Sequence, residues 1–168
     1  MLGAPDPQPD DMHTLIEIDA AEQADDEIVA AFANLIPQLS PGRAIPQRAE
    51  LEEIVRTDST AVLLARRIDT RAIVGMATLV VYRVPTGVRA TIEDVVVDVA
   101  ARGYGGGEAL VREALARAAD RGAEVVDLTS HASRTAANRL YLKLGFNQRQ
   151  TKAFRCELRR ETEVARSD

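Results

Sequence analysis

Residues 91–110 read TIEDVVVDVAARGYGGGEAL, and this stretch decides the fold. Its first part is rich in β-branched residues, which favours a strand, and four glycines around Tyr104 then precede a helical pattern. Glycines let successive amides turn inward, and the first turn of a helix adds unpaired N–H groups and a partial positive charge. A strand, a glycine loop and a helix in this order predict a binding site for a phosphate or a pyrophosphate.

Two common phosphate-binding motifs do not match this loop. A nucleotide P-loop has Lys and Ser/Thr after its last glycine, whereas Glu108 and Ala109 follow Gly107. The dinucleotide fingerprint would place its third glycine two residues further along, and it belongs to a βαβ unit that this part of the chain does not predict. A glycine-rich turn that only permits tight packing is the alternative interpretation.

Alternation and helical spacing, followed outward from this stretch, predict the other elements. Strands are expected at 14–18, 61–64, 73–82, 91–97 and 124–129, with a last strand through Phe154, Cys156 and Leu158. Helices are expected at 25–39, at 48–56, between Gly107 and Gly122, and at 134–144. The three strands between 61 and 97 form an antiparallel meander because tight turns join them. We predict a mixed α/β (α+β) domain with a central, mostly antiparallel mixed sheet flanked by helices.

Length and composition limit the organisation and the partners. The chain of 168 residues fits one domain, which we place at 13–160 between flexible tails at 1–12 and 161–168. A net charge of -5 argues against nucleic-acid binding, and no apolar run approaches the length of a membrane span. The single cysteine, Cys156, excludes an internal disulfide and a cysteine zinc site. We therefore expect a cytoplasmic protein without a metal site.

The glycine loop and a second motif together resemble the GCN5-related N-acetyltransferases (GNAT). Arg102, Gly105 and Gly107 match the family's coenzyme A motif, Gln/Arg-x-x-Gly-x-Gly/Ala. Residues 137–146, ANRLYLKLGF, fit its Ala-x-x-Leu-Tyr-x-x-Leu-Gly-Phe ending, and the resemblance covers about residues 14–159. Two positions depart from the pattern. Arg134 stands where many members have an asparagine that contacts pantetheine, and Val99 stands where proline is common.

The resemblance implies the GNAT fold, whose sheet splays between its fourth and fifth core strands, here 91–97 and 124–129, to admit acetyl-coenzyme A (acetyl-CoA). The fourth strand would pair with the pantetheine arm and the loop amides would bind the pyrophosphate. The residues implied in cofactor binding are Val95, Val96, Val97, Arg102, Gly103, Tyr104, Gly105, Gly106, Gly107, Glu108 and Asn138. The family also transfers the acetyl group directly to an amine in a ternary complex, and homodimers are common in it.

Tyr141 receives a catalytic role from the same resemblance, because in many members this hydroxyl protonates the departing thiolate. A phenol with an ordinary pKa near 10 can donate to a sulfur anion. The alternative is that Tyr141 is a core residue, since it shares helical spacing with Ala137, Leu140 and Leu144.

Glu93 is the candidate general base. An alkyl amine is almost fully protonated at neutral pH and must lose a proton before it attacks. Glu93 and Asp94 lie in the strand beside the expected thioester, and alternation places only one of them on the cofactor face. We choose Glu93 because related polyamine and aminosugar acetyltransferases have a similar pair. A solvent-facing carboxylate, an arginine partner or a water chain in its place are the alternatives.

Other polar residues receive no catalytic role. His13 and His131 are far apart in sequence, and Ser130 lacks the Gly-x-Ser-x-Gly elbow of a hydrolase. Cys156 is predicted to be a packed core thiol, and Gly145 is predicted to be a left-handed helix cap.

The function predicted from these residues is acetyl transfer from acetyl-CoA to an amine, with a small primary amine as the expected acceptor. The rival function is a non-catalytic domain that senses acetyl-CoA or binds a partner. Such a domain would keep Gly105 and Gly107 without needing Tyr141 or Glu93.

Overall fold

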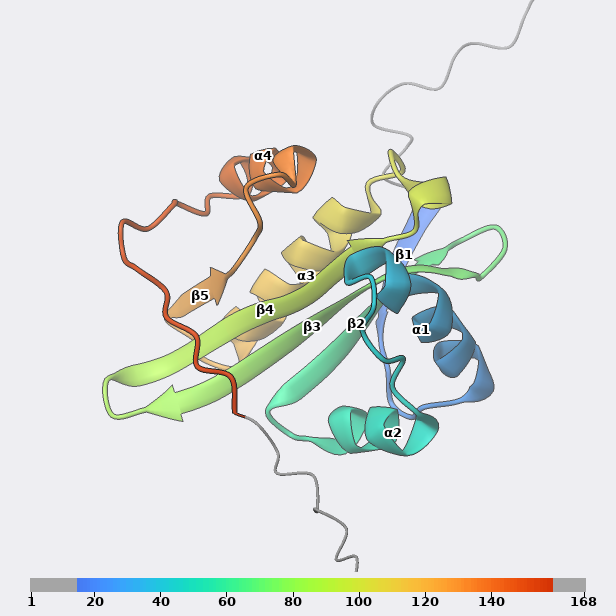
Figure 1. Ribbon diagram of the computed structural model, residues 1–168, viewed down its shortest axis with the longest axis horizontal. Helices are drawn as coiled ribbons and strands as arrows, with labels where there is room; N and C mark the ends of the chain where they lie inside the picture. Colours follow the sequence, from blue (N-terminus) through green and yellow to red (C-terminus); the bar gives the residue numbers. More distant parts are fainter. Residues whose placement is uncertain (1–14, 159–168) are drawn as a thin grey trace, which may run out of the picture.

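The computed structural model describes residues 15–158 and contains one five-stranded sheet with the strand order β1-β2-β3-β4-β5 (Figure 1). The strands are β1 (Ile16–Ala20), β2 (Thr60–Arg67), β3 (Ile73–Val84), β4 (Gly87–Val97) and β5 (Val125–Leu128). The first four strands pair antiparallel, and β5 pairs parallel to β4. The predicted mixed fold with a mostly antiparallel sheet is confirmed.

Four α-helices flank this sheet, and their bounds lie close to those predicted. They are α1 (Asp26–Leu39), α2 (Arg48–Arg56), α3 (Gly106–Asp120) and α4 (Thr135–Lys143). Asp25 caps α1 by accepting a 2.8 Å hydrogen bond from the Ile28 amide. Gly145 has a φ of 92° just after α4, so its prediction as a left-handed cap is confirmed.

The core consists of two layers because the inner strands are buried on both faces. α1 and α2 cover one face, where Phe32, Leu35 and Leu51 pack on Leu64. α3 covers the other face, where Leu110 and Val111 pack on Leu63, Leu79 and Ile92 (Figure 1). Leu63 and Leu64 are neighbours in β2 and point to opposite layers, which explains the continuous apolar run in that strand.

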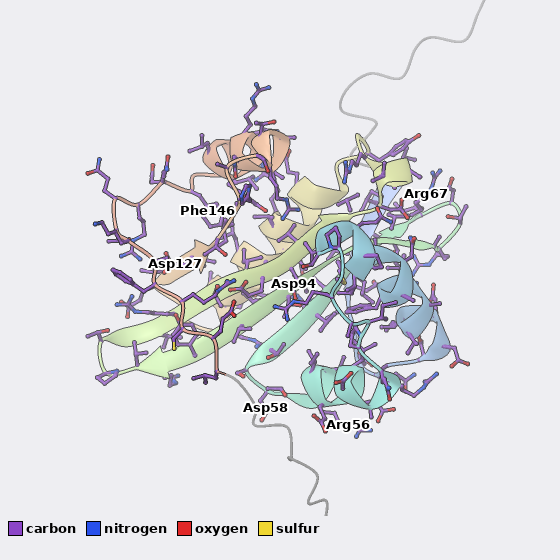
Figure 2. All side chains as sticks on the ribbon, viewed as in Figure 1. Arg56, Asp58, Arg67, Asp94, Asp127 and Phe146 are labelled. Atoms are coloured by element: carbon purple, nitrogen blue, oxygen red, sulfur yellow. The ribbon has the colours of Figure 1, made fainter. Side chains whose placement is uncertain are left out.

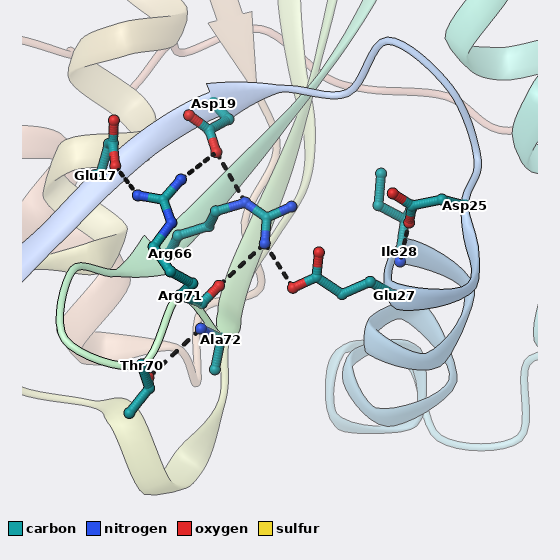
Figure 3. Close-up of polar contacts among 9 residues, drawn as sticks. All are labelled: Glu17, Asp19, Asp25, Glu27, Ile28, Arg66, Thr70, Arg71 and Ala72. Carbon is teal, nitrogen blue, oxygen red and sulfur yellow. Dashed lines mark hydrogen bonds and ion pairs between the residues drawn. The ribbon is translucent and has the colours of Figure 1, made fainter.

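Arg66 joins α1 to the edge of the sheet (Figure 3). Its side chain is only 13% exposed and lies 2.8 Å from Asp19 of β1 and 2.6 Å from Glu27 of α1. It also donates a 3.0 Å hydrogen bond to the carbonyl of Arg71. The hydrogen bond with Glu27 raises the pKa of the Arg66 guanidinium despite its burial. Arg66 is therefore a permanent cation that holds two acidic residues from different elements together.

The predicted closing strand is wrong. Residues 146–158 form no helix or strand, and the side chains of Phe154 and Leu158 are 91% and 90% exposed. Cys156 is also exposed, so its prediction as a packed core thiol is wrong too. Alternating apolar residues favour a strand only when a neighbouring strand satisfies their backbone groups, and within residues 15–158 β5 pairs with β4 alone.

Several predictions fall outside the described residues. The tails at 1–12 and 161–168, His13 and the start of the first strand at Thr14 lie there wholly, and the domain limits at 13 and 160 lie there as well. Among the described helices, none combines the length and the apolar character that a membrane span requires. The described residues also contain no group of three or more His, Cys, Asp or Glu side chains that could hold a metal ion.

Candidate active site

β4 and β5 separate partway along their length. The parallel pairing joins only Arg89–Ile92 to residues 125–128, although β4 continues to Val97. Beyond Ile92 and Leu128 the two strands have no shared ladder, so the edge of β4 that faces β5 is open for a ligand. This is the splay that was expected between 91–97 and 124–129.

A β-bulge shapes β4 at the splay. Its register with β3 shifts between the pairs Thr78↔Glu93 and Met76↔Val96, so Asp94 and Val95 oppose the single residue Ala77. Asp94 has a φ of 53°, an uncommon conformation for a residue other than glycine. Because the bulge interrupts alternation, Glu93 and Asp94 are both exposed and both line the cavity at the splay. The expectation that only one of them faces this site is wrong.

A cavity of about 140 Å³ lies between the parted strands and α4. Its charged and polar wall consists of Glu93 and Asp94 from β4, Thr129 after β5, and Arg134 and Tyr141. Leu39, at the end of α1, closes one side. Figure 2 shows Asp94 near the centre of the molecule, with Asp127 of β5 and Phe146 after α4 toward the left of the view. Residues from four separate parts of the chain therefore meet at one opening.

Tyr141 belongs to the core and to the cavity at the same time. Its side chain is 6% exposed and its ring meets Phe146 edge-on, with the centroids 5.9 Å apart. Among the described residues its hydroxyl has no hydrogen-bond partner, although the residue lines the cavity. Burial raises the pKa of the Tyr141 phenol, and the nearby positive charge of Arg134 partly opposes that rise. The ring is buried, but the hydroxyl is not among the fully buried polar atoms without a partner, so it opens into the cavity and is available to donate to a ligand.

Arg134 spans the opening from the α4 side. It is the residue that precedes α4, and its Nη2 donates a 2.9 Å hydrogen bond to the carbonyl of Val95. This carbonyl lies in the bulged part of β4, where no β5 residue pairs with it. In a longer β5, a backbone N–H would donate to this carbonyl. The Arg134 guanidinium donates to it instead.

The glycine loop forms the N-terminus of α3 next to this opening. Gly103 and Gly105 have φ values of 91° and 79°, which other residues rarely adopt, and Gly105 is the N-cap without any side-chain cap. The amides of the first helical turn, Gly106 to Glu108, therefore point out of the helix without acceptors inside it. A methyl group at Gly107 would lie 3.7 Å from Leu140 and 3.8 Å from Val97. These are ordinary van der Waals contacts, so packing within the protein does not require a glycine at position 107.

The order of these parts matches a known family. A family model described as "Acetyltransferase (GNAT) family" matches residues 19–146. This chain belongs to the GNAT family. Membership makes it an acetyl-CoA-dependent acetyltransferase, as the sequence predicted. None of the curated proteins matches the chain in sequence.

Solved structures of acetyltransferases share this fold. An acetyltransferase of Trypanosoma brucei is 27% identical with a TM-score of 0.70, covering 85% of this chain and 99% of that one. An aminoglycoside acetyltransferase from an uncultured soil metagenomic sample, in complex with trehalose, has 19% identity and a TM-score of 0.75 over 88% of this chain and 99% of its own. AAC(6')-Iy, in complex with the bisubstrate analogue CoA-S-monomethyl-acetylneamine, has 19% identity and a TM-score of 0.68 over 85% of this chain and 98% of its own.

The GNAT loop is held in place by α1, which the sequence did not reveal. Asp98 follows β4 and accepts hydrogen bonds from the Ala100 amide at 2.9 Å and from Asn34 at 2.6 Å. Gln38 accepts a 3.0 Å hydrogen bond from the Val99 amide. The bond from Ala100, followed by that from Asn34, lowers the pKa of the Asp98 carboxyl. No local pattern signals a contact between residues that are so far apart in sequence.

Two residues predicted to bind the cofactor have side chains that serve the GNAT scaffold. The Glu108 carboxylate bonds to Lys143 at 2.8 Å and to Arg112 at 2.7 Å, and these partners lower its pKa. Asn138 donates to the carbonyl of His131 at 3.2 Å and so fixes the loop before α4. Because the Glu108 carboxylate is occupied by these partners, only its backbone amide, in the first turn of α3, is free to donate to a phosphate.

Two further observations were not anticipated. Tyr104 lies under Arg67 of β2, with the guanidinium 5.4 Å from the ring centre, so its ring packs on the scaffold. Ser130 lies two residues after the end of β5, and its buried hydroxyl has no partner among the described residues. An orphaned buried hydroxyl beside the splay is a further group that a bound ligand could satisfy.

Proposed function

We propose that this protein transfers the acetyl group of acetyl-CoA to the primary amine of a small acceptor, by direct attack in a ternary complex. The observation that carries the proposal is Tyr141. It is 6% exposed, its hydroxyl has no hydrogen-bond partner among the described residues, and it shares a cavity with two carboxylates where β4 and β5 part. A sensor that only binds acetyl-CoA has no need for such an arrangement.

The open edge of β4 and the loop before α3 fit the shape and charge of acetyl-CoA. The backbone of Val95 to Val97 has no strand neighbour on the β5 side and would bind the amides of the pantetheine arm. The Val95 carbonyl, which already accepts from Arg134, would use its second lone pair. The amides from Arg102 to Glu108 surround an uncapped helix N-terminus, which suits a pyrophosphate. Packing does not require a glycine at position 107, and the lack of a side chain there would let the ligand approach the backbone closely.

The protein's own residues would manage two protons. Acetyl-CoA supplies a thioester whose carbonyl carbon accepts the amine. The Glu93 carboxylate takes the proton that the acceptor loses as it changes from ammonium to amine. Once the carbon–nitrogen bond has formed, the carbon–sulfur bond breaks and Tyr141 would give its phenolic proton to the sulfur. The nitrogen of the adduct must lose a second proton to become an amide, and this proton would restore the Tyr141 phenol. The remaining rate enhancement comes from holding both substrates in one orientation.

The charges of the cavity favour a cationic acceptor of small size. Glu93 and Asp94 are exposed at the opening, and neither forms an ion pair with a described basic residue. Among the described residues, the Glu93 carboxylate accepts one side-chain hydrogen bond, from the Thr91 hydroxyl at 2.9 Å. Two such carboxylates attract an ammonium group to the position where it must lose a proton.

A panel of primary amines with acetyl-CoA tests this proposal, with release of the coenzyme thiol as the signal and the mass of the product as confirmation. We expect thiol release that depends on both substrates, and a product heavier than the acceptor by one acetyl group. Binding of acetyl-CoA without turnover for any amine would contradict the proposal and support a sensor. Thiol release that is independent of the amine would indicate hydrolysis.

A further inference from the structure

Arg134 is a cation of the cavity without an acidic partner. No carboxylate of residues 15–158 lies within ion-pair distance of it, whereas Arg66, Arg112 and Arg117 each have at least one. Within residues 15–158 its guanidinium makes one hydrogen bond, from Nη2 to the Val95 carbonyl at 2.9 Å. The remaining N–H groups of the guanidinium are therefore free beside Tyr141, on the same cavity wall.

A buried tyrosine is a weak acid for the task proposed for Tyr141. An ordinary phenol has a pKa near 10, and a thiol has a pKa near 8.5, so a phenol already gives its proton to a thiolate reluctantly. Burial raises the pKa of Tyr141 further and makes the transfer less favourable. A fixed positive charge near the phenolic oxygen counteracts this effect because it stabilises the tyrosinate.

We propose that Arg134, held by its hydrogen bond to the Val95 carbonyl, stabilises the tyrosinate that Tyr141 becomes when it gives its proton to the departing thiolate. This inference rests on the proposed function. Arg134 acts through Tyr141 and is thus a positioning residue. The bulge at Asp94 and Val95 contributes to this arrangement, because the Val95 carbonyl in the bulge accepts the hydrogen bond that orients the guanidinium.

The other charges near Tyr141 cannot take over this role. Glu93 and Asp94, from β4, are negative and would raise the pKa of a neighbouring phenol. Glu108 of α3 is paired with Lys143 and Arg112, and Asp127 of β5 lies 3.5 Å from Arg149. Arg134 is the only basic residue among the described residues that line the cavity.

The first test measures the ionisation of Tyr141 and does not require activity. The protein has three tyrosines, so Tyr82→Phe and Tyr104→Phe leave Tyr141 as the single ultraviolet signal of tyrosinate. In this background Arg134→Gln should raise the pKa of Tyr141 by about one unit, and Arg134→Lys should largely restore it. Arg139→Gln is the matched control, because both arginines are exposed but Arg139, on α4, does not line the cavity. An Arg134→Gln protein that titrates like the control would overturn the inference.

The second test is a double-mutant cycle on kcat. Arg134→Gln should lower kcat by about tenfold when Tyr141 is present and by much less in a Tyr141→Phe background. A merely structural arginine would lower kcat by the same factor in both backgrounds, and this result would refute the inference. If the wild-type protein acetylates no amine, the proposed function fails, while the titration still decides whether Arg134 controls Tyr141.

Discussion

Asn34 in α1 donates a 2.6 Å hydrogen bond to the carboxylate of Asp98, which follows β4 and begins the loop that leads to α3. The same carboxylate accepts the Ala100 amide at 2.9 Å. Asp98 therefore caps the short 3₁₀ turn at Val99–Ala101 and joins this turn to α1, the helix that covers the face of the sheet opposite to α3. The position of the glycine loop relative to β4 depends on this contact.

Asp98→Ala should lower the free energy of unfolding by about 1–2 kcal/mol at neutral pH, because charged hydrogen bonds are lost. Its hydrogen bonds lower the pKa of Asp98 in the folded protein. The stabilisation is therefore complete above the unfolded pKa of about 3.9 and disappears as the pH falls through the lowered folded value. Urea unfolding at several pH values should show the two proteins converging in acid. Asp120→Ala, which removes an exposed carboxylate from the end of α3, should show no such convergence.

Gly107→Ala should separate ligand binding from stability. The helical backbone at Gly107 accepts a methyl group without a clash, so the free energy of unfolding should stay the same or rise by up to about 1 kcal/mol. The methyl group would stand beside the helix amides that we propose to bind the pyrophosphate, and the Kd for acetyl-CoA should rise by about tenfold or more. Gly105→Ala is not a clean test, because its φ of 79° strains any other residue. Unchanged affinity of Gly107→Ala by calorimetry would place the cofactor elsewhere.

Arg66→Ala should cost about 1–3 kcal/mol of stability, because it leaves Asp19 and Glu27 without their shared cation. Arg71→Ala is the comparison. The side chain of Arg71 is 57% exposed and also contacts Asp19, so its loss should cost less than about 1 kcal/mol. Thermal or urea unfolding of the two variants measures the difference, and equal losses would show that Arg66 is not the central residue of this group.

The sequence predicted most of the fold because its elements are local. The helices at α1 and α2 and the strands β2 to β4 follow from periodicity and from turns between 67 and 87. The glycine loop and Tyr141 could be recognised because their spacing matched a motif.

Features that depend on pairing could not be predicted. The bulge at Asp94 appears only when β4 is aligned with β3, so alternation assigned Glu93 and Asp94 to opposite faces. Phe154 and Leu158 alternate as a strand does, yet they are exposed because no described strand pairs with them. The contact between Asn34 and Asp98 joins distant segments and leaves no local trace.

Glu93→Gln should lower kcat/KM by about 10²–10⁴ at neutral pH with a preferred amine, as the loss of a general base does. The deficit should shrink as the pH rises toward the amine's own pKa of about 10.4, because more acceptor arrives neutral. Asp94→Asn is the matched variant, since it removes a carboxylate from the same cavity. It should show a smaller loss with little dependence on pH. Parallel pH profiles for Glu93→Gln and the wild-type protein would assign deprotonation to a water chain.

The turnover number of Tyr141→Phe tests the central claim most directly. The Tyr141 hydroxyl has no partner among the described residues, so its removal should leave the free energy of unfolding unchanged or slightly higher. The Kd for acetyl-CoA should also change little, whereas kcat should fall by about tenfold or more, because the lost interaction exists only in the transition state. A kcat equal to that of the wild-type protein, with stability and affinity retained, would contradict the role of Tyr141 as the proton donor.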